Sequence, residues 1–307
     1  MGRYIIRRLL ISIVTLIGIS IMIFVLLRVL PGDPARMMVG DNATYEDILE
    51  VRRRYNLDKP LHVQYYSFLR DLSRGDLGTS LRTKEPVLYE ISSRFPATLE
   101  LSLISIVIAA GVGIPLGVLA AIKRYSWFDS TVSVGTLFGV AMPVYATGLL
   151  LMFIFAVSLG WLPAAGRGDN WQSAILPSLT LASFSMPLIT RMTRASVMEV
   201  MSEDYVRTAY AKGQQKRIVI FRHILRNALI PVVTVVGLQF GSLLGGAILT
   251  ETIFAWPGLG QLLIMSLSRY DYPMVQGLVL VFAALFILVN ILVDILYAFI
   301  DPRIHYD

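Results

Sequence analysis

Long apolar stretches separated by polar connections form the main pattern of this 307-residue chain. Six stretches reach roughly 20 residues, the length that an α-helix needs to cross the hydrocarbon core of a bilayer. The fourth contains Pro177 and Pro187, which neighbouring helices can accommodate within a membrane. The pattern therefore predicts an all-α membrane protein with six transmembrane helices. These lie at about Leu9–Leu30, Leu99–Ile122, Val132–Leu159, Ala174–Thr190, Leu229–Leu249 and Gln276–Ile300.

Basic residues gather in alternate connections, and this asymmetry predicts how the helices are oriented. Arg3, Arg7 and Arg8 precede the first stretch, Lys123 and Arg124 follow the second, and more basic residues follow the fourth. Because short cytoplasmic loops of membrane proteins carry the excess of Lys and Arg, both termini are expected in the cytoplasm. The same bias accounts for the formal net charge of +6 without a nucleic-acid partner.

The longest polar connection, 31–98, is expected to be an extracytoplasmic helical loop. Thr44 and Asp47 approximate a capping box, Pro60 opens an amphipathic stretch, and glycines at 75 and 78 end it. The loop either caps the outer membrane face or helps to receive a substrate-delivering protein. The chain then divides into an N-terminal helix at 1–30, this loop at 31–98 and a core domain at 99–307.

The connection 251–273 is apolar but broken by Pro257, Gly258 and Gly260. A continuous helix cannot run through these residues, because proline lacks the backbone donor and glycine weakens a helix. We expect this segment to dip back into the protein at membrane depth, where irregular backbone is tolerated only if protein covers it.

Glycines recur at four-residue spacing in the second and fifth stretches. Small residues allow membrane helices to approach closely, which is a main source of their association. These positions predict helix packing, although some of them could instead line a pathway. They are Gly113, Gly117, Gly237, Gly241 and Gly245.

Polar and helix-breaking residues within or beside the apolar stretches are candidates for a translocation path, since such residues in membranes are often functional. For Asp294 the alternative is a structural ion pair or helix-end hydrogen bond, and for Gln239 it is a hydrogen bond between helices. The candidates are Pro143, Gln239, Glu251, Asn290 and Asp294.

The polar segment 191–231 lies between the fourth and fifth stretches and carries eight Lys or Arg against three acids. Gly213 is placed to end a first short helix as a C-terminal cap. Ile218, Phe221 and Leu225 then repeat at helical spacing, and Pro231 follows where the next apolar stretch begins. A polar helix–turn–helix of this kind suits a membrane subunit that a soluble motor must grip.

The strings EDYVRTAYAKG (203–213) and RHILRNALIPVVT (222–234) resemble the cytoplasmic "EAA" loop of bacterial ATP-binding-cassette importer permeases. Ala209, Gly213 and Leu225 match the general pattern of that loop. Arg207 stands where the general pattern has Glu, which is common in the dipeptide/oligopeptide branch. Residues 26–36, 96–102, 251–273 and 297–304 resemble the same branch, so the resemblance covers the whole chain.

The resemblance implies the first permease subunit of a peptide importer, with the type I importer fold, in the bacterial inner membrane. The implied partners are a second homologous permease, two ATPase subunits, an extracytoplasmic binding protein, the peptide substrate and membrane lipid. ATP and Mg²⁺ would be bound by the ATPase subunits, and this chain would hold no cofactor. Nickel or glutathione is the alternative cargo. The residues expected to dock on the ATPases are Glu203, Asp204, Tyr205, Arg207, Thr208, Ala209, Ala211, Lys212 and Gly213.

Other function classes find little support in the residues. The sequence has no G-x-x-x-x-G-K-[ST] phosphate loop, so ATP-driven work is expected to come from another chain. His62, His223 and His305 are dispersed, cysteine is absent, and neither H-E-x-x-H nor G-x-S-x-G occurs, which disfavours a metal site or a membrane hydrolase. Asp294 is the one clearly intramembrane acid, which disfavours an ion-driven secondary transporter.

Overall fold

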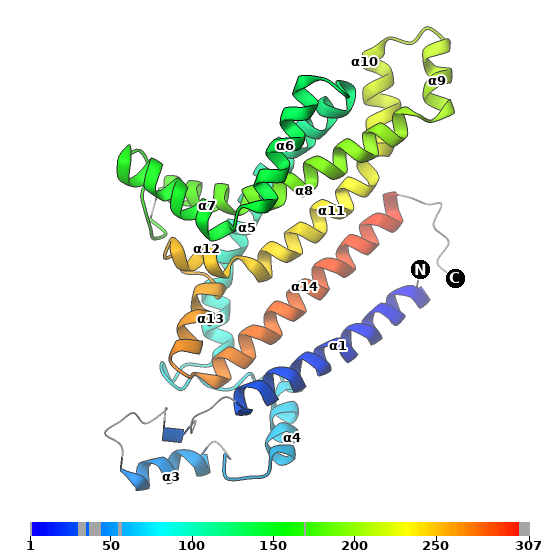
Figure 1. Cartoon of the computed structure of the whole chain (residues 1–307). Helices are drawn as coiled ribbons and strands as arrows, with labels where there is room; N and C mark the ends of the chain where they lie inside the picture. Colours follow the sequence, from blue (N-terminus) through cyan, green and yellow to red (C-terminus); the bar gives the residue numbers. More distant parts are fainter. Residues whose placement is uncertain (1, 30–34, 37–43, 55–56, 169, 301–307) are drawn as a thin grey trace. The chain divides into compact units, whose positions relative to one another are not determined.

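The computed structural model of this chain describes residues 2–29, 35–36, 44–54, 57–168 and 170–300, and these are helical almost throughout (Figure 1). The expected helix end at Leu30, His305 and residues 301–304 lie outside the described ranges. The α-helices are α1 (Gly2–Val29), α3 (Tyr45–Arg54), α4 (Leu61–Leu72), α5 (Val87–Ile122), α6 (Trp127–Ala141), α7 (Val144–Leu151), α8 (Ile175–Met201), α9 (Asp204–Ala211), α10 (Lys216–Ile218), α11 (Leu225–Gly246), α12 (Ile248–Ile253), α13 (Leu259–Ser268) and α14 (Tyr272–Ile300). Three segments of other helical type are η1 (Met152–Ser158), η2 (Trp171–Ala174) and η3 (Val219–Ile224).

Five described helical segments are long and apolar enough to cross a membrane, and the number becomes six if one bent pair counts as a single span. This confirms the all-α membrane class. The five unbroken spans are Ile6–Val29, Val87–Ile122, Trp171–Met201, Lys216–Gly245 and Tyr272–Leu296.

The span expected at 132–159 is broken by a sharp bend. α6 ends at Ala141, and α7 with η1 continues at an angle of 102° to it. Pro143 lies at the bend and lacks the N–H that would extend the hydrogen-bond ladder of α6. Met142, which precedes the proline, has the extended backbone (φ −77°, ψ 127°) that this position favours.

Three other helices differ from their expected bounds. α5 begins at Val87 rather than near residue 99, so the polar residues just before the second apolar stretch already belong to its helix. α8 continues past residue 190 to Met201 and contains Pro187. α10, η3 and α11 form one span from Lys216, so Pro231 lies inside a helix rather than at its start.

Residues 1–98 and 257–285 form the first of two compact units. The aromatic ring of Phe24 in α1 lies 5.1 Å from that of Tyr65 in α4, and the Ser20 and Tyr65 hydroxyls are 2.9 Å apart. Pro60 precedes α4, as the sequence predicts. A second apolar cluster joins the start of α5 to α13 and the start of α14 through Val87, Ile91, Leu259, Leu262, Met274 and Leu278.

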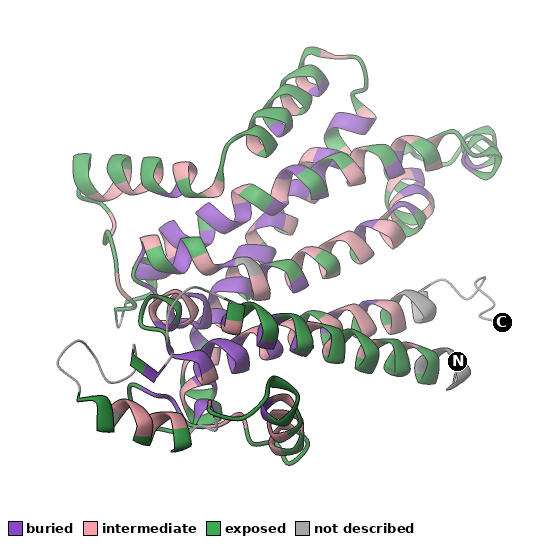
Figure 2. Cartoon of the chain, turned by 60° about the horizontal axis from the view of Figure 1, so that its bottom comes forward, coloured by how far each residue is buried: buried purple, intermediate pink, exposed green. Residues whose placement is uncertain are grey.

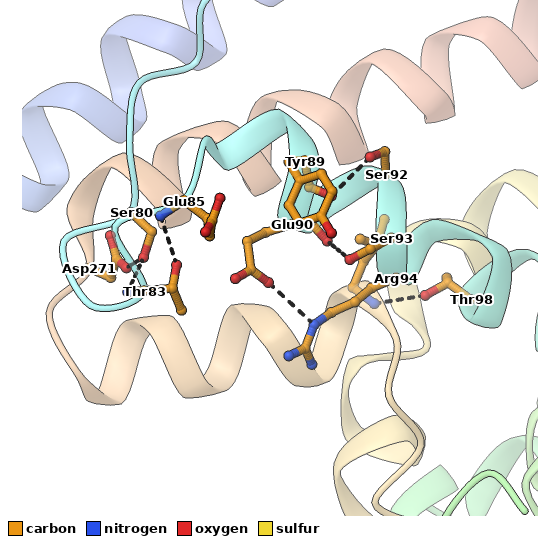
Figure 3. A network of polar contacts seen from close by, with 11 residues as sticks. Ser80, Thr83, Glu85, Tyr89, Glu90, Ser92, Ser93, Arg94, Thr98 and Asp271 are labelled. Carbon is orange, nitrogen blue, oxygen red and sulfur yellow. Dashed lines mark hydrogen bonds and ion pairs between the residues drawn. The ribbon is translucent and has the colours of Figure 1, made fainter.

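Asp271 is the polar centre of this unit, and the sequence offered no signal for it (Figure 3). Its carboxylate is 2% exposed and accepts hydrogen bonds from the Ser80 hydroxyl at 2.5 Å and the Leu81 amide at 3.1 Å. The turn before α5 is thereby fixed to the start of α14. Nearby, Arg94 and Glu90 form an ion pair of 3.8 Å within α5.

Residues 99–256 and 286–307 form the second unit. α8 is its central helix and packs against α6, α7, α11 and α12. Two-thirds of its most apolar window is buried, against 17% for the corresponding window of α1 (Figure 2). Ser196 of α8 donates a hydrogen bond of 2.8 Å to the carbonyl of Ala228 in α11, which ties the two helices together at a buried position.

The helix break predicted within 251–273 is confirmed. α12 ends at Ile253, Ala255 adopts a positive φ of 47°, and α13 begins only at Leu259. The Trp256 side chain is 1% exposed and its amide donates to the carbonyl of Glu251 at 2.8 Å, so the connection is tightly held. Entry of this segment into the membrane remains a prediction.

Candidate functional site

The segment between α8 and α11 contains a short helix, α9, beside the ends of long spans (Figure 1). α9 covers Asp204–Ala211, with Glu203 at its N-cap position. Gly213 ends it with a φ of +74°, a conformation that is unfavourable for residues with a Cβ atom. The amides of Gly213 and Gln214 donate to the carbonyls of Tyr210 and Ala209 at 2.9 and 3.3 Å. The predicted helix, glycine cap and second helix are therefore confirmed.

One face of α9 is buried against its neighbours. Val206 and Ala209, 1% and 6% exposed, join a single apolar cluster with residues of α5, α8, η3 and α11. Burial of these side chains stabilises the position of α9, because removal of apolar surface from water is favourable. Ala209 therefore holds α9 in place. The resemblance had implied that Ala209 docks on the ATPases. The cluster consists of Ala121, Val197, Val206, Ala209, Val219, Ile224 and Ala228.

The opposite face of α9 and the turn that follows are exposed. Tyr205 and Tyr210 are 40% and 42% exposed, so two aromatic rings lie among charged groups. Arg207 and Asp204 approach to 3.6 Å, and both side chains are largely in solvent, where such a pair contributes little to stability. Eight of the nine predicted docking residues lie on this surface, namely Glu203, Asp204, Tyr205, Arg207, Thr208, Ala211, Lys212 and Gly213.

The second helix of the segment extends the exposed surface and contacts α9. The Asn227 amide donates to the Tyr205 hydroxyl at 2.9 Å, and His223 lies 2.9 Å from the Gln214 side-chain oxygen. Phe221 is 70% exposed, although the helical repeat suggested an apolar contact face for it. Further basic side chains on this surface are those of Lys216, Arg217, Arg222 and Arg226.

The sequence did not predict an ion pair that fixes the first turn of α6 to α8. Its basic partner lies within the 191–231 segment. Arg194 donates from Nε and Nη2 to the two carboxylate oxygens of Asp129, at 2.6 and 2.8 Å. Asp129 also accepts from the Tyr125 amide at 3.0 Å, and its side chain is 5% exposed. A two-point Arg–carboxylate pair fixes orientation as well as distance. It therefore holds the 123–126 turn against α8.

One translocation-path candidate lies at a helix bend and another at a contact between helices. Pro143 is exposed at the bend between α6 and α7. Gln239 in α11 accepts a hydrogen bond of 3.2 Å from the buried hydroxyl of Ser185 in α8. The interhelical hydrogen bond that the sequence offered for Gln239 is therefore present, while a path-lining role for either residue remains a prediction.

The other three candidates lie on α12 and α14. Glu251 is fully buried in α12. Asn290 donates to the carbonyl of Phe286 one turn earlier in α14, at 2.9 Å. Asp294 is half-buried on the same helix.

Four of the five predicted packing glycines lie at close helix contacts. A Cβ atom on Gly113 or Gly117 would come within 3.1 Å of backbone atoms of α8. A Cβ atom on Gly237 would overlap the Val293 side chain of α14, and one on Gly241 would lie 3.2 Å from Val289.

Gly245 has open space beside it, so it makes no close helix contact within the described part of this chain, and its role in helix packing remains a prediction. The sequence missed three further close contacts, at Gly139 against Pro187, at Gly148 against Thr180 and at Gly277 against Val87. Among the described residues no group of three or more His, Cys, Asp or Glu side chains is arranged to hold a metal ion.

Two family descriptions match the chain. Residues 113–306 match "Binding-protein-dependent transport system inner membrane component", and residues 1–102 match the N-terminal part described as "Binding-prot-dependent transport system membrane comp, N-term". The first match alone covers more than half of the chain.

Curated relatives align over essentially the full length. The chain is 47% identical over 306 residues to the glutathione transport system permease protein GsiC of Salmonella typhimurium, covering 100% of both chains. It is 43% identical over 330 residues to the dipeptide transport system permease protein DppB of Alkalihalophilus pseudofirmus, covering 99% of both.

Solved structures with the same fold are more distant in sequence. The chain matches the inward-facing MetNI methionine ABC transporter with a TM-score of 0.58 and 18% identity, over 70% of this chain and 97% of that one. A second crystal form of that transporter gives the same TM-score at 17% identity, over 71% and 99%. The fold is that of ABC importer permeases. This chain belongs to the family of binding-protein-dependent transport system inner membrane components and is a multi-pass permease subunit of the bacterial inner membrane.

Proposed function

We propose that this chain forms one half of the translocation path of an ATP-driven importer for short peptides. The observation that carries the proposal is the surface of α9, which is exposed on one face and anchored by Val206 and Ala209 on the other. Its partners are a second, homologous permease, two ATPase subunits and an extracytoplasmic binding protein. The description of the family as binding-protein-dependent supports the last of these.

The coupling step follows from how α9 is held. A force applied to its exposed face by an ATPase passes into α8 and α11, because all three elements share one apolar cluster and Ser196 bonds to Ala228. ATP binding by the motor then moves these spans and switches the path between its inward and outward forms. ATP and Mg²⁺ are bound by the ATPases, and α9 of this chain transmits the movement to the spans.

The positive charge of the short connections supports a cytoplasmic position for both termini and for α9. The 31–98 region is then extracytoplasmic. Residues 191–231 dock the motor, while Pro143, Gln239, Glu251, Asn290 and Asp294 are the residues proposed for the path within the 99–307 domain.

The docking assignment is tested by reversing charge on the exposed face. Arg207→Glu and Lys212→Glu are expected to weaken association with the cognate ATPase subunits at least tenfold, since like charges brought together at an interface cost several kcal/mol. Arg124→Glu is the matched control, because Arg124 is exposed on the same proposed membrane side but lies outside α9. If all three variants weakened association with the ATPase subunits equally, or if none of them weakened it, docking through α9 would be contradicted.

Short peptides and glutathione are both supported as cargo, because the relatives named for glutathione and for dipeptide transport align over the whole chain. Glutathione is itself a small peptide, so the two candidates share a similar demand on the path. Calorimetry of the cognate binding protein with dipeptides, oligopeptides, glutathione and nickel decides between them. Tight binding of nickel alone would overturn the peptide assignment.

A further inference from the structure

The first unit contains a basic pocket that the proposed transport cycle does not use. The pocket has a volume of about 360 Å³ and lies between the end of α1 and the helices α3 and α4. Three guanidinium groups line it, those of Arg28, Arg52 and Arg53. Among the described residues of the lining, Asp58 supplies the one carboxylate, so positive charge is in excess. Such a site attracts an anion.

Arg28 is held in place before any ligand arrives. Its Nε donates to the Gln64 side-chain oxygen at 2.9 Å, and Nη1 donates to the Phe24 carbonyl at 3.2 Å. Its guanidinium carbon lies 3.4 Å from the centre of the Phe24 ring. Gln64 is 8% exposed and donates to the Lys59 carbonyl at 2.8 Å. Among the described residues Nη2 of Arg28 has no acceptor, which leaves it available to an anionic oxygen.

The position of the pocket narrows the class of anion. Arg28 lies in the last turn of α1, one residue before the end of the candidate span Ile6–Val29. The end of a span lies at the level of the phospholipid headgroups, where Arg side chains extend toward phosphate. Val25 and Val29 are 46% and 75% exposed on the same helix, so an apolar surface continues directly from the charged site.

The lining is also amphipathic. Leu49, Leu57 and Leu61 line the pocket together with the guanidinium groups. A soluble inorganic anion gains nothing from this apolar wall or from the exposed surface of α1. A phospholipid uses both, because its phosphate accepts charge-assisted hydrogen bonds from Arg while its glycerol and acyl parts lie against apolar side chains.

We propose that this pocket binds the phosphate of an anionic phospholipid, with the acyl chains against the exposed side of α1. Arg28 and Gln64 form the fixed part of the site, and Arg52 and Arg53 of α3 reach the headgroup from the other side. The lipid then links α3 to α1 through a shared anion. The inference does not depend on the cargo or on motor docking.

The test measures retention of phosphatidylglycerol by the purified full-length chain after delipidation, with native mass spectrometry and titration in bilayer nanodiscs. Arg52→Gln and Arg53→Gln are each expected to weaken binding about fivefold, equivalent to about 1 kcal/mol for a basic side chain at a membrane surface. Arg74→Gln is the matched control, because Arg74 is exposed in the same unit but does not line the pocket. Circular dichroism checks that each variant keeps its helical content.

Other outcomes would overturn the proposal. If the Arg52→Gln/Arg53→Gln double variant bound phosphatidylglycerol with unchanged affinity, the pocket would be excluded as the lipid site. Equal loss in Arg74→Gln would show attraction by general charge alone. Phosphatidylethanolamine bound as tightly as phosphatidylglycerol would contradict selection by the excess positive charge. Binding of inorganic phosphate that displaces the lipid, with the same dependence on Arg52 and Arg53, would identify a soluble anion as the ligand.

Discussion

Asp129 and Arg194 are 65 residues apart in the sequence, yet they form the best-defined ion pair of the second unit. Both carboxylate oxygens are used, and the Asp129 side chain is almost completely buried. Removal of one partner from such a pair leaves a charge without compensation in a region that water barely reaches, which is strongly destabilising.

Asp129→Ala is therefore expected to lower the free energy of unfolding by about 3 kcal/mol, the lower end for a buried pair because Arg194 is 28% exposed. Detergent-denaturation titration of the purified chain measures the change. Asp71→Ala is the control, because Asp71 pairs with Arg70 at 3.2 Å on an exposed surface and should contribute about 0–1 kcal/mol. A similar loss in the two variants would contradict a structural role for the buried pair.

Single residues differ in how far the sequence reveals them. Gly213 could be placed as a helix cap because its position depends on a local pattern, and its φ of +74° agrees. Asp129 and Asp271 could not be identified in the same way, because their partners lie on segments distant in sequence. A buried carboxylate becomes recognisable only when the fold has brought its donors together.

At the level of elements, α11 and α14 are packed through glycine. Gly237→Leu should force its side chain into Val293 and lower the free energy of unfolding by about 1–3 kcal/mol, as overpacking does. Gly245→Leu, on the same helix, should lack this effect because the space beside Gly245 is open. Both substitutions change helix propensity in the same direction, so their difference reports packing.

The thermal unfolding midpoint and the yield of folded complex measure this difference. Equal behaviour of the two variants would mean that close packing at Gly237 is unimportant. The four-residue glycine repeat could predict close contact between helices but not which glycines meet a helix of this chain, because that depends on where the partner helix runs. Gly245 illustrates this limit.

The bend between α6 and α7 shows a second limit at this scale. A proline within an apolar stretch is compatible with a straight, a kinked or a broken membrane helix. The sequence therefore predicted a weak point at Pro143 but not a turn of 102°. The choice among these outcomes depends on neighbouring helices, here α8, against which both α6 and α7 pack.

At the scale of the whole molecule, the proposed coupling requires that movement of α9 reach the spans. Gly213→Val should introduce about 1–2 kcal/mol of backbone strain at the end of α9 and disturb the exposed docking surface. We expect ATPase activity stimulated by the binding protein to persist in part while uptake falls, measured in proteoliposomes containing the full complex.

Gly160→Val is the control for this prediction. Gly160 also has a positive φ, of 62°, and open space around it, but it lies in the connection between η1 and η2. If uptake and ATPase activity remained coupled in Gly213→Val, the α9 cap would have no role in coupling. An equal loss of both in Gly160→Val would contradict that role as well.

The number of apolar stretches and their all-α character could be predicted because the length of a span and the burial of apolar residues are local properties. The polar helix–turn–helix at 191–231 could be predicted because it is polar where its surroundings are not. The path could not be assigned in this way. The side chain of Gln239 can accept a hydrogen bond from Ser185 or contact substrate, and the sequence around it does not distinguish the two roles.

The bend at Met142 and Pro143 places a demand on whatever surrounds it. Where α6 stops, the carbonyl groups of its last turn lose their partners along the chain, and Pro143 has no N–H to supply one. Hydrocarbon cannot hydrate a peptide carbonyl, and each one left dry costs several kcal/mol. Lipid acyl chains therefore cannot satisfy the carbonyl groups at this bend. Water or a hydrogen-bond donor of another protein segment has to satisfy these carbonyl groups, so lipid alone cannot surround the bend.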